Sequence, residues 1–158
     1  MLRGSLGYEM IQLSPAICRF CRILVIGVLM LGMGGLFSGC ASTIRFSITA
    51  DDQTNKTTPV YVVVRSVDGQ TFLAEHYNAV AEKVFQNEPD ETILERTIIF
   101  PNQTEVIQIE QPETGNLGVY VLFSEPGENW RIPLQAPFPQ EVLISLGKNQ
   151  IRRVQIRR

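Results

Sequence analysis

The amino-acid sequence predicts a mainly β domain: a two-sheet β-sandwich of seven or eight strands with one amphipathic helix. Short alternating or wholly apolar runs follow one another along residues 43–157, and turn residues separate them about every 8–12 positions. Residues 117–123 form a run that is apolar on both faces, too short for a stable helix and typical of a buried strand. Only one stretch, residues 71–85, changes to the helical period.

The first half of the domain is predicted as two strands, a loop between them, and the helix. Residues 43–50 alternate, as in a half-buried strand, and residues 51–59 are polar up to a closing proline. Residues 60–67 are apolar on both faces and indicate a central strand. The helix at 71–85, whose start Thr71 could cap, would lie on the sandwich with one apolar face made of Phe72, Leu73, Tyr77, Val80, Ala81 and Val84.

The second half is predicted as strands joined by turns. These strands are expected at residues 92–100, 104–110, 117–123, 130–136, 142–146 and 150–157, the first interrupted at Glu95-Arg96. A central hairpin joins 117–123 to 130–136 through Pro126-Gly127, a type II turn pattern because glycine accepts a positive φ. Trp130 would open the returning strand, and Val154 and Ile156 would face inward in the closing strand.

Residues 1–39 are predicted as a signal peptide that is removed. Arg19 and Arg22 precede fifteen apolar residues, 23–37, a run short of the roughly 20 needed to span a membrane but typical of a signal-peptide core. Leu-Phe-Ser-Gly-Cys at 36–40 resembles a bacterial lipobox, in which cleavage precedes a lipidated cysteine, although Phe37 stands where leucine is usual. Cys40 is therefore the predicted lipidation site. An uncleaved signal anchor is the alternative, and Met10 is an alternative start.

The predicted mature domain, residues 40–158, keeps 119 of the 158 residues and a net charge of −4, because three arginines and Glu9 leave with the leader. A mildly acidic domain is a poor candidate for binding nucleic acid. Cys18 and Cys21 form a Cys-x-x-Cys pair, but both lie in the leader. The mature domain is thus expected to be exported without a disulfide, its core held by packing alone.

The sequence offers no catalytic constellation, so we expect neither an enzyme nor a small-molecule substrate, and no cofactor beyond the lipid on Cys40. His76 is the only histidine, which leaves neither a histidine metal cluster nor a serine–histidine–aspartate set with a spare ligand. Asp51 and Asp52 could offer oxygen ligands to a cation, but no third carboxylate lies in their loop. The arginine pairs 152–153 and 157–158 fit a solvated strand face or a basic patch for phospholipid or a partner.

The order of lipobox, helix and hairpin resembles the TssJ (SciN) lipoproteins of bacterial type VI secretion systems. The residues that carry the resemblance are Gly118-Val119-Tyr120, Phe123, Pro126-Gly127 and Trp130-Arg131, and it extends from about Ile44 to Arg153. It implies a transthyretin-like β-sandwich that faces the periplasm and is anchored by lipid to the outer membrane. Ala41, which follows the cysteine, is similar to the outer-membrane sorting signal. The implied role is to tether the periplasmic C-terminal domain of an inner-membrane TssM-like protein.

The resemblance places the partner contact in the loop after the first strand. Here that loop comprises Asp51, Asp52, Gln53, Thr54, Asn55, Lys56, Thr57 and Thr58. It is the longest polar stretch of the mature domain, and strands on both sides hold its ends, an arrangement that often carries binding. Its net charge of −1 favours a neutral to basic partner surface. The alternative is a plain connector.

Two other classes of function stay open. A lipoprotein of another envelope assembly, such as a pilotin, would be favoured by an all-helical or repetitive structure, and the sequence shows neither. A periplasmic ligand-binding or inhibitor lipoprotein would be favoured by a concave aromatic pocket, whereas the one tryptophan, Trp130, is expected in the hairpin.

Overall fold

The computed structural model describes residues 42–86, 90–112 and 114–158, and the predicted signal peptide, Cys40 and Ala41 lie outside this part. The described residues form eight β-strands in two sheets, with two short α-helices, which confirms the predicted β-sandwich. Residues 41–158 group into one compact unit. Neither α-helix of the described part is long and apolar enough to cross a membrane.

The first sheet has the strand order β4-β1-β7-β8. Its strands are β1 (Thr43–Ala50), β4 (Thr104–Glu110), β7 (Glu141–Leu146) and β8 (Ile151–Arg157). The first strand of the chain, β1, lies inside the sheet, antiparallel to β4 and parallel to β7. Strand β8 pairs only with β7 and forms one edge.

The second sheet has the order β3-β2-β5-β6, with every neighbouring pair antiparallel. Its strands are β2 (Val60–Val67), β3 (Ile93–Ile99), β5 (Asn116–Leu122) and β6 (Arg131–Leu134). The two runs that are apolar on both faces, β2 and β5, are its central strands because each needs cover on both sides. The core between the sheets covers one side, and the helices cover the other.

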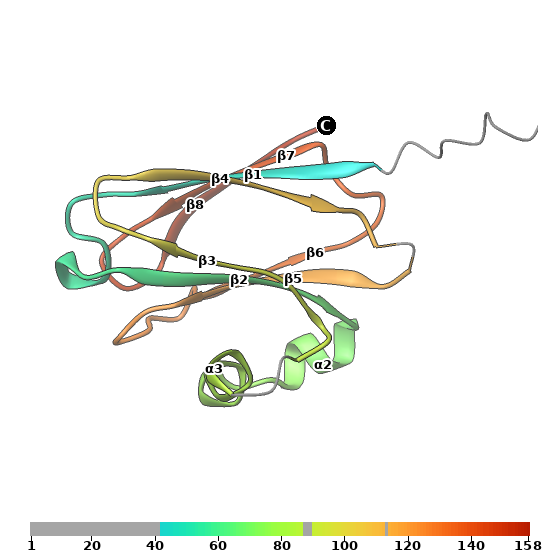
Figure 1. The fold of residues 1–158 in the computed structure, drawn as a ribbon, viewed down its shortest axis with the longest axis horizontal. Helices are drawn as coiled ribbons and strands as arrows, with labels where there is room; N and C mark the ends of the chain where they lie inside the picture. The colour runs from blue at the N-terminus through green and yellow to red at the C-terminus, as the bar shows by residue number, and fades with distance from the viewer. Residues whose placement is uncertain (1–41, 87–89, 113) are drawn as a thin grey trace, which may run out of the picture. The chain divides into compact units, whose positions relative to one another are not determined.

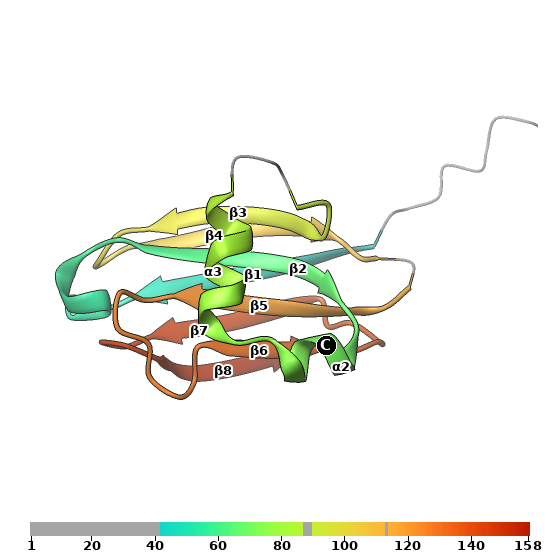
Figure 2. The same ribbon diagram turned by 90° about the horizontal axis from the view of Figure 1, so that it is seen from below.

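The helices α2 (Gly69–Ala74) and α3 (Tyr77–Phe85) lie on the outer face of the second sheet, as Figures 1 and 2 show. The prediction of one continuous helix was wrong, because Glu75 and His76 are extended, with ψ angles of 129° and 155°. Helix α2 is capped by Asp68, not by Thr71: its carboxylate accepts the N–H groups of Gln70 and Thr71 at 2.9 Å each. Because the two helices have different axes, Leu73 lies 76% exposed and off the predicted apolar face.

The hairpin between β5 and β6 also differs from its prediction in detail. Gly127 does not take the positive φ of a type II turn; among the described glycines only Gly115 does. Instead, Gly127 donates its N–H to the Asn149 carbonyl at 2.7 Å, so close that a Cβ atom would lie 3.2 Å from that oxygen. Trp130 stands just before β6, and β3 runs through Glu95-Arg96 without interruption.

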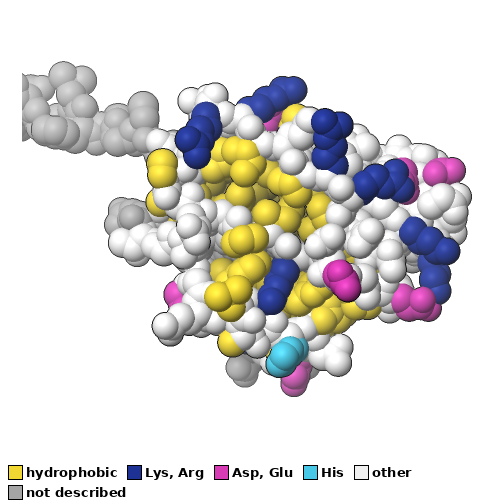
Figure 3. Space-filling model, turned by 180° about the vertical axis from the view of Figure 1, so that it is seen from behind, with side chains coloured by type: hydrophobic (Ala, Val, Ile, Leu, Met, Phe, Trp, Pro, Cys, Tyr) yellow, Lys and Arg dark blue, Asp and Glu magenta, His cyan; other side chains and the backbone are white. Residues whose placement is uncertain are grey.

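The alternation in β8 predicts that Val154 and Ile156 face inward, yet they are 37% and 54% exposed. Their register places them beside Ile144 and Val142, which belong to the core, so the predicted direction is right. The cover is missing because the opposite edge strand, β6, has only four residues. Figure 3 shows the apolar area that this leaves open on the β6 and β8 side of the sandwich.

Candidate partner-binding loop and its support

The predicted partner-binding loop, residues 51–58, is a tight structure between β1 and β2. It contains a short 3-10 turn, Thr54–Thr57. Asn55, Lys56 and Thr57 have φ angles of 50°, 56° and 65°, so three successive residues that are not glycine take the left-handed conformation. Such backbone is costly, by about 1–3 kcal/mol per residue, and persists only where surrounding contacts hold it.

Asn55 supplies those contacts. Its side chain is 3% exposed, donates through Nδ2 to the Pro59 carbonyl at 2.6 Å, and accepts through Oδ1 the Ser124 N–H at 2.7 Å. The Asn55 carbonyl also accepts the Thr58 hydroxyl at 2.6 Å. One asparagine therefore joins the loop to the end of β5, and it is among the residue types that best tolerate left-handed backbone.

Thr54 and Asp51 hold the other end of the loop. The Thr54 hydroxyl, fully buried, donates to Asp51 Oδ1 at 2.9 Å. The same oxygen accepts the Gln53 N–H at 3.1 Å, and Asp51 Oδ2 pairs with Arg152 of β8 at 3.0 Å. These residues shape the loop, so a partner would meet the five exposed positions, Asp52, Gln53, Lys56, Thr57 and Thr58.

Lys56 gives this exposed surface its one positive charge. Its ammonium lies 2.5 Å from Glu125 of the β5–β6 hairpin, and both side chains are largely exposed. The hydrogen bond from Lys56, with the attraction of its charge, lowers the pKa of the Glu125 carboxyl. The loop and the hairpin tip thus form one polar surface at the end of the sandwich where β1 ends.

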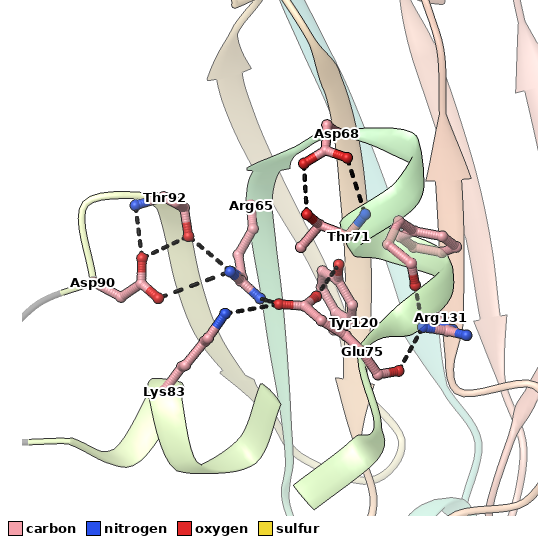
Figure 4. Close-up of polar contacts among 10 residues, drawn as sticks. Arg65, Asp68, Thr71, Glu75, Lys83, Asp90, Thr92, Tyr120 and Arg131 are labelled. Atoms are coloured by element: carbon pink, nitrogen blue, oxygen red, sulfur yellow. Dashed lines mark hydrogen bonds and ion pairs between the residues drawn. The ribbon is translucent and has the colours of Figure 1, made fainter. Parts of the chain in front are cut away.

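A second polar site, which the sequence analysis missed, lies under the helices. Arg65 of β2 is 1% exposed, and its Nη1 donates to Glu75 Oε1 at 2.8 Å. Lys83 of α3 donates to the same oxygen at 2.8 Å, and the Tyr120 hydroxyl donates to Glu75 Oε2 at 2.9 Å. Figure 4 shows these side chains meeting at the break between α2 and α3. Glu75 therefore joins both helices to the central strands of the second sheet.

The electrostatics of this cluster favour ionised carboxylates. Burial by itself would raise the pKa of Glu75, but hydrogen bonds from Lys83, Arg65 and Tyr120 outweigh it and hold the pKa below its ordinary value. Asp90 accepts the Thr92 hydroxyl at 2.6 Å, which lowers its pKa, and Thr92 in turn accepts Arg65 Nε at 2.9 Å. The buried guanidinium of Arg65 thus has charge and hydrogen-bond partners on two sides.

Aromatic rings pack beside the Glu75 cluster. Tyr120, Tyr77 and Trp130 pack together, with ring centroids 5.0 Å apart for Tyr77–Trp130 and 5.8 Å for Tyr120–Trp130. Arg131 lies over the Trp130 ring at 5.1 Å and donates to the Glu75 carbonyl at 2.8 Å. Burial raises the pKa of Tyr77 to about 12, and its hydroxyl donates to the Phe123 carbonyl. The polar and aromatic side chains around Glu75 hold the helices rigidly on the sheet, because each buried polar side-chain group among the described residues has a hydrogen-bond partner.

The described residues offer little for catalysis or metal binding. No three His, Cys, Asp or Glu side chains gather there to hold a metal ion. His76 is exposed and stands just before α3, and Asp51 is committed to Thr54, Gln53 and Arg152. The arrangement suits a rigid scaffold with an exposed loop at one end.

Comparison with solved structures shows that the fold of this scaffold is similar to that of type VI secretion system lipoproteins. The T6SS lipoprotein TssJ1 from Pseudomonas aeruginosa has a TM-score of 0.60 at 17% identity, over 75% of this chain and 98% of that one. Serratia marcescens Lip, described as a membrane-bound component of the Type VI Secretion System, has a TM-score of 0.58 at 20% identity, over 73% and 97%. A chain of the structure described as "T6SS protein TssM C-terminal domain (869-1107) from EAEC" has a TM-score of 0.51 at 19% identity, over 71% and 99%. The predicted TssJ-like fold is confirmed.

A comparison of the sequence with protein-family profiles identifies the family of this chain. The profile of the family described as "IglE, N-terminal domain" matches residues 61–146, from β2 to the end of β7. The match covers more than half of the chain, and the chain belongs to this family. A comparison with curated proteins found no match.

Proposed function

We propose that the protein is a lipid-anchored structural component of a type VI secretion membrane complex, which tethers a TssM-like inner-membrane protein to the outer membrane. The observation that carries this proposal is the extent of the structural match. It covers 98% of the TssJ1 chain, so nearly the whole of a known T6SS lipoprotein has a counterpart here. The fold alone does not define a function, and the lipobox supplies independent support.

The anchor in this proposal is a covalent lipid on Cys40. Each buried methylene contributes roughly 0.8 kcal/mol, and two or more acyl chains hold a protein on a membrane stably. Cys40 lies three residues before β1, so the sandwich would stand close to the membrane. Ala41 favours the outer membrane, with the domain facing the periplasm.

The binding surface in this proposal is the exposed part of the loop 51–58. The buried side chains of Thr54 and Asn55 are structural, so a test must leave them intact. We therefore choose the triple variant Asp52→Ala, Gln53→Ala, Lys56→Asn, because asparagine accepts the left-handed backbone at position 56. The partner is the purified periplasmic C-terminal domain of the TssM-like protein from the same organism, and binding is measured by calorimetry.

We expect the triple variant to melt like the wild-type chain and to bind about tenfold or more weakly, a loss of about 1.4 kcal/mol or more. The matched control is Gln135→Ala with Gln140→Ala, which changes two exposed residues at the opposite end of the sandwich. The control should bind like wild type. Wild-type affinity in the triple variant would remove this loop from the interface, and no binding by any form would contradict the TssM-like partner.

A further inference from the structure

We propose a second docking surface on this protein: the open side of the sandwich between β6 and β8 binds an extended, acidic segment of a partner protein, which pairs with the free edge of β8. This surface is separate from the exposed part of the loop 51–58. Three features of the structure support it: an uncovered strand edge, an apolar floor, and an excess of arginine.

The strand edge is long and open. β8 has seven residues and pairs only with β7, whereas β6, the edge strand of the other sheet, has four. The two edges meet at one end, where the Ile151 N–H donates to the Asn129 carbonyl at 2.7 Å. Beyond this contact the described residues leave the second edge of β8 unpaired, so its backbone groups are free to accept another strand.

The floor of this side is apolar only in part. A hollow of about 240 Å³ opens between the two edges, and its lining combines the apolar Ile132, Ile151 and Val154 with Asn129 and three arginines, Arg131, Arg152 and Arg153. Val154 and Ile156, 37% and 54% exposed, continue the apolar surface along β8. Figure 3 shows apolar side chains gathered on this side, with polar and basic side chains among them. An incoming strand with apolar residues at alternate positions would cover these apolar side chains.

The charge of this side is positive in a chain whose net charge is −2. β8 and the residue after it carry Arg152, Arg153, Arg157 and Arg158, all exposed. Arg152 pairs with Asp51 and Arg157 with Glu141, both at 3.0 Å. No described carboxylate pairs with Arg153 or Arg158. Figure 3 shows Lys and Arg side chains bordering the apolar area.

The positive charge of β8 indicates which kind of strand could bind to its free edge. A second copy would bring four more arginines to the same edge, and like charges placed opposite one another oppose pairing. A strand with alternating acidic and apolar residues meets both requirements, because its apolar face covers Val154 and Ile156 while its carboxylates pair with Arg153 and Arg158.

The test uses the purified residues 41–158, which form one compact unit, and a fluorescent peptide of about ten residues that alternates Glu with Val. The matched peptide has Lys in place of every Glu. We expect the acidic peptide to bind, to weaken as salt rises, and to protect β8 amides but not β4 amides from hydrogen exchange. The loop variant Asp52→Ala, Gln53→Ala, Lys56→Asn should bind it normally, which separates this surface from the proposed TssM-like contact.

Two single variants with matched controls identify the surface. Arg153→Glu should weaken binding of the acidic peptide about tenfold or more, while Arg45→Glu, the same charge change at an exposed position of β1, should not. Val154→Ser should weaken it, while Val106→Ser, at 43% exposure on β4, should not. Equal effects of each variant and its control would overturn the proposal. Two other results would also overturn it. The first is that the protein binds phosphatidylglycerol vesicles through Arg153 and does not bind the acidic peptide. The second is that the protein forms a dimer and Val154→Ser abolishes that dimer.

Discussion

At the scale of single residues, Glu75 links more of the structure than its sequence context suggests. Its side chain is 8% exposed and accepts hydrogen bonds from a strand, a helix and a tyrosine of the neighbouring strand. The side chain of Arg65, its partner on β2, is 2% exposed, so the pair is taken out of water almost completely. Removing the charge of Glu75 leaves the buried Arg65 guanidinium with Asp90, 3.8 Å away, as its remaining carboxylate partner among the described residues.

We therefore predict that Glu75→Gln lowers the free energy of unfolding by about 3 kcal/mol, the lower end of the range for a broken buried pair, because Asp90 still faces Arg65. Chemical denaturation measures this, and Glu82→Gln, an exposed position on α3, is the matched control and should change stability little. If the two variants unfold at the same denaturant concentration, the cluster does not hold the helices in solution.

The pH dependence of stability gives the same prediction an independent readout. The pKa of Glu75 is lowered from 4.5 in the folded state, so the unfolded chain takes up the proton first as pH falls. The contribution of Glu75 is present in full above about pH 4.5 and is lost as pH falls through the folded pKa. Glu75→Gln should flatten the stability profile in that acidic range and leave its shape at neutral pH unchanged.

At the scale of elements, Trp130 joins the hairpin to the helices. Its ring packs against Tyr77 at the start of α3 and Tyr120 of β5, and it touches the cores on both sides of the second sheet. Gly118 makes room for this arrangement, because a Cβ atom at that position would lie 2.6 Å from the Tyr120 ring. Trp130, just before the four-residue edge strand β6, therefore packs against the core alongside Ile132 and Leu134 of that strand.

We predict that Trp130→Ala destabilises the domain by about 3 kcal/mol, the lower end of the range for large aromatic residues, because the ring is only half-buried. The control is Phe85→Ala, another aromatic deletion on this face, where the ring is 54% exposed and should contribute less. The measurement is the denaturation midpoint of each variant. An unchanged midpoint for Trp130→Ala would show that this residue does not stabilise the core and would make it a candidate for partner binding.

At the scale of the whole molecule, the strands were predictable because each carries its own pattern. The alternation in β1 and the apolar runs of β2 and β5 place them correctly without knowledge of their neighbours. The direction of Val154 was also predictable, but its exposure was not, since exposure depends on the length of β6 in the other sheet. A pattern within one strand says where a side chain points and not what covers it.

The polar interior was not predictable for the same reason. Arg65 sits in a run of valines and finds Glu75 ten positions away, across a helix break that the helical periodicity of residues 71–85 concealed. Asn55 reads as one polar residue of a polar loop, yet its decisive contact is with Ser124, 69 positions along the chain. A buried arginine in a central strand demands a carboxylate partner, and that requirement was the one available signal.

The proposed membrane anchor belongs to this scale too. We predict that Cys40→Ser abolishes lipidation and leaves unprocessed precursor or soluble protein, as metabolic labelling with a radioactive fatty acid would show. The paired control is Cys18→Ser with Cys21→Ser, which should keep the label because both positions leave with the predicted leader. Equal label on the Cys40→Ser chain would contradict the lipobox.

The place of β1 in its sheet has a mechanical consequence under the proposed function. The chain enters β1 at Thr43, near the lipid, and leaves it at Ala50, where the candidate loop begins. Force between a membrane and a partner held by that loop would therefore pass along one strand. β1 is hydrogen-bonded to β4 on one side and β7 on the other, with the load parallel to both ladders. Such shear strains all of these bonds together, whereas a strand peeled from an edge loses them one at a time. If the protein has the proposed role, this arrangement would let the domain bear tension between the lipid anchor and the partner.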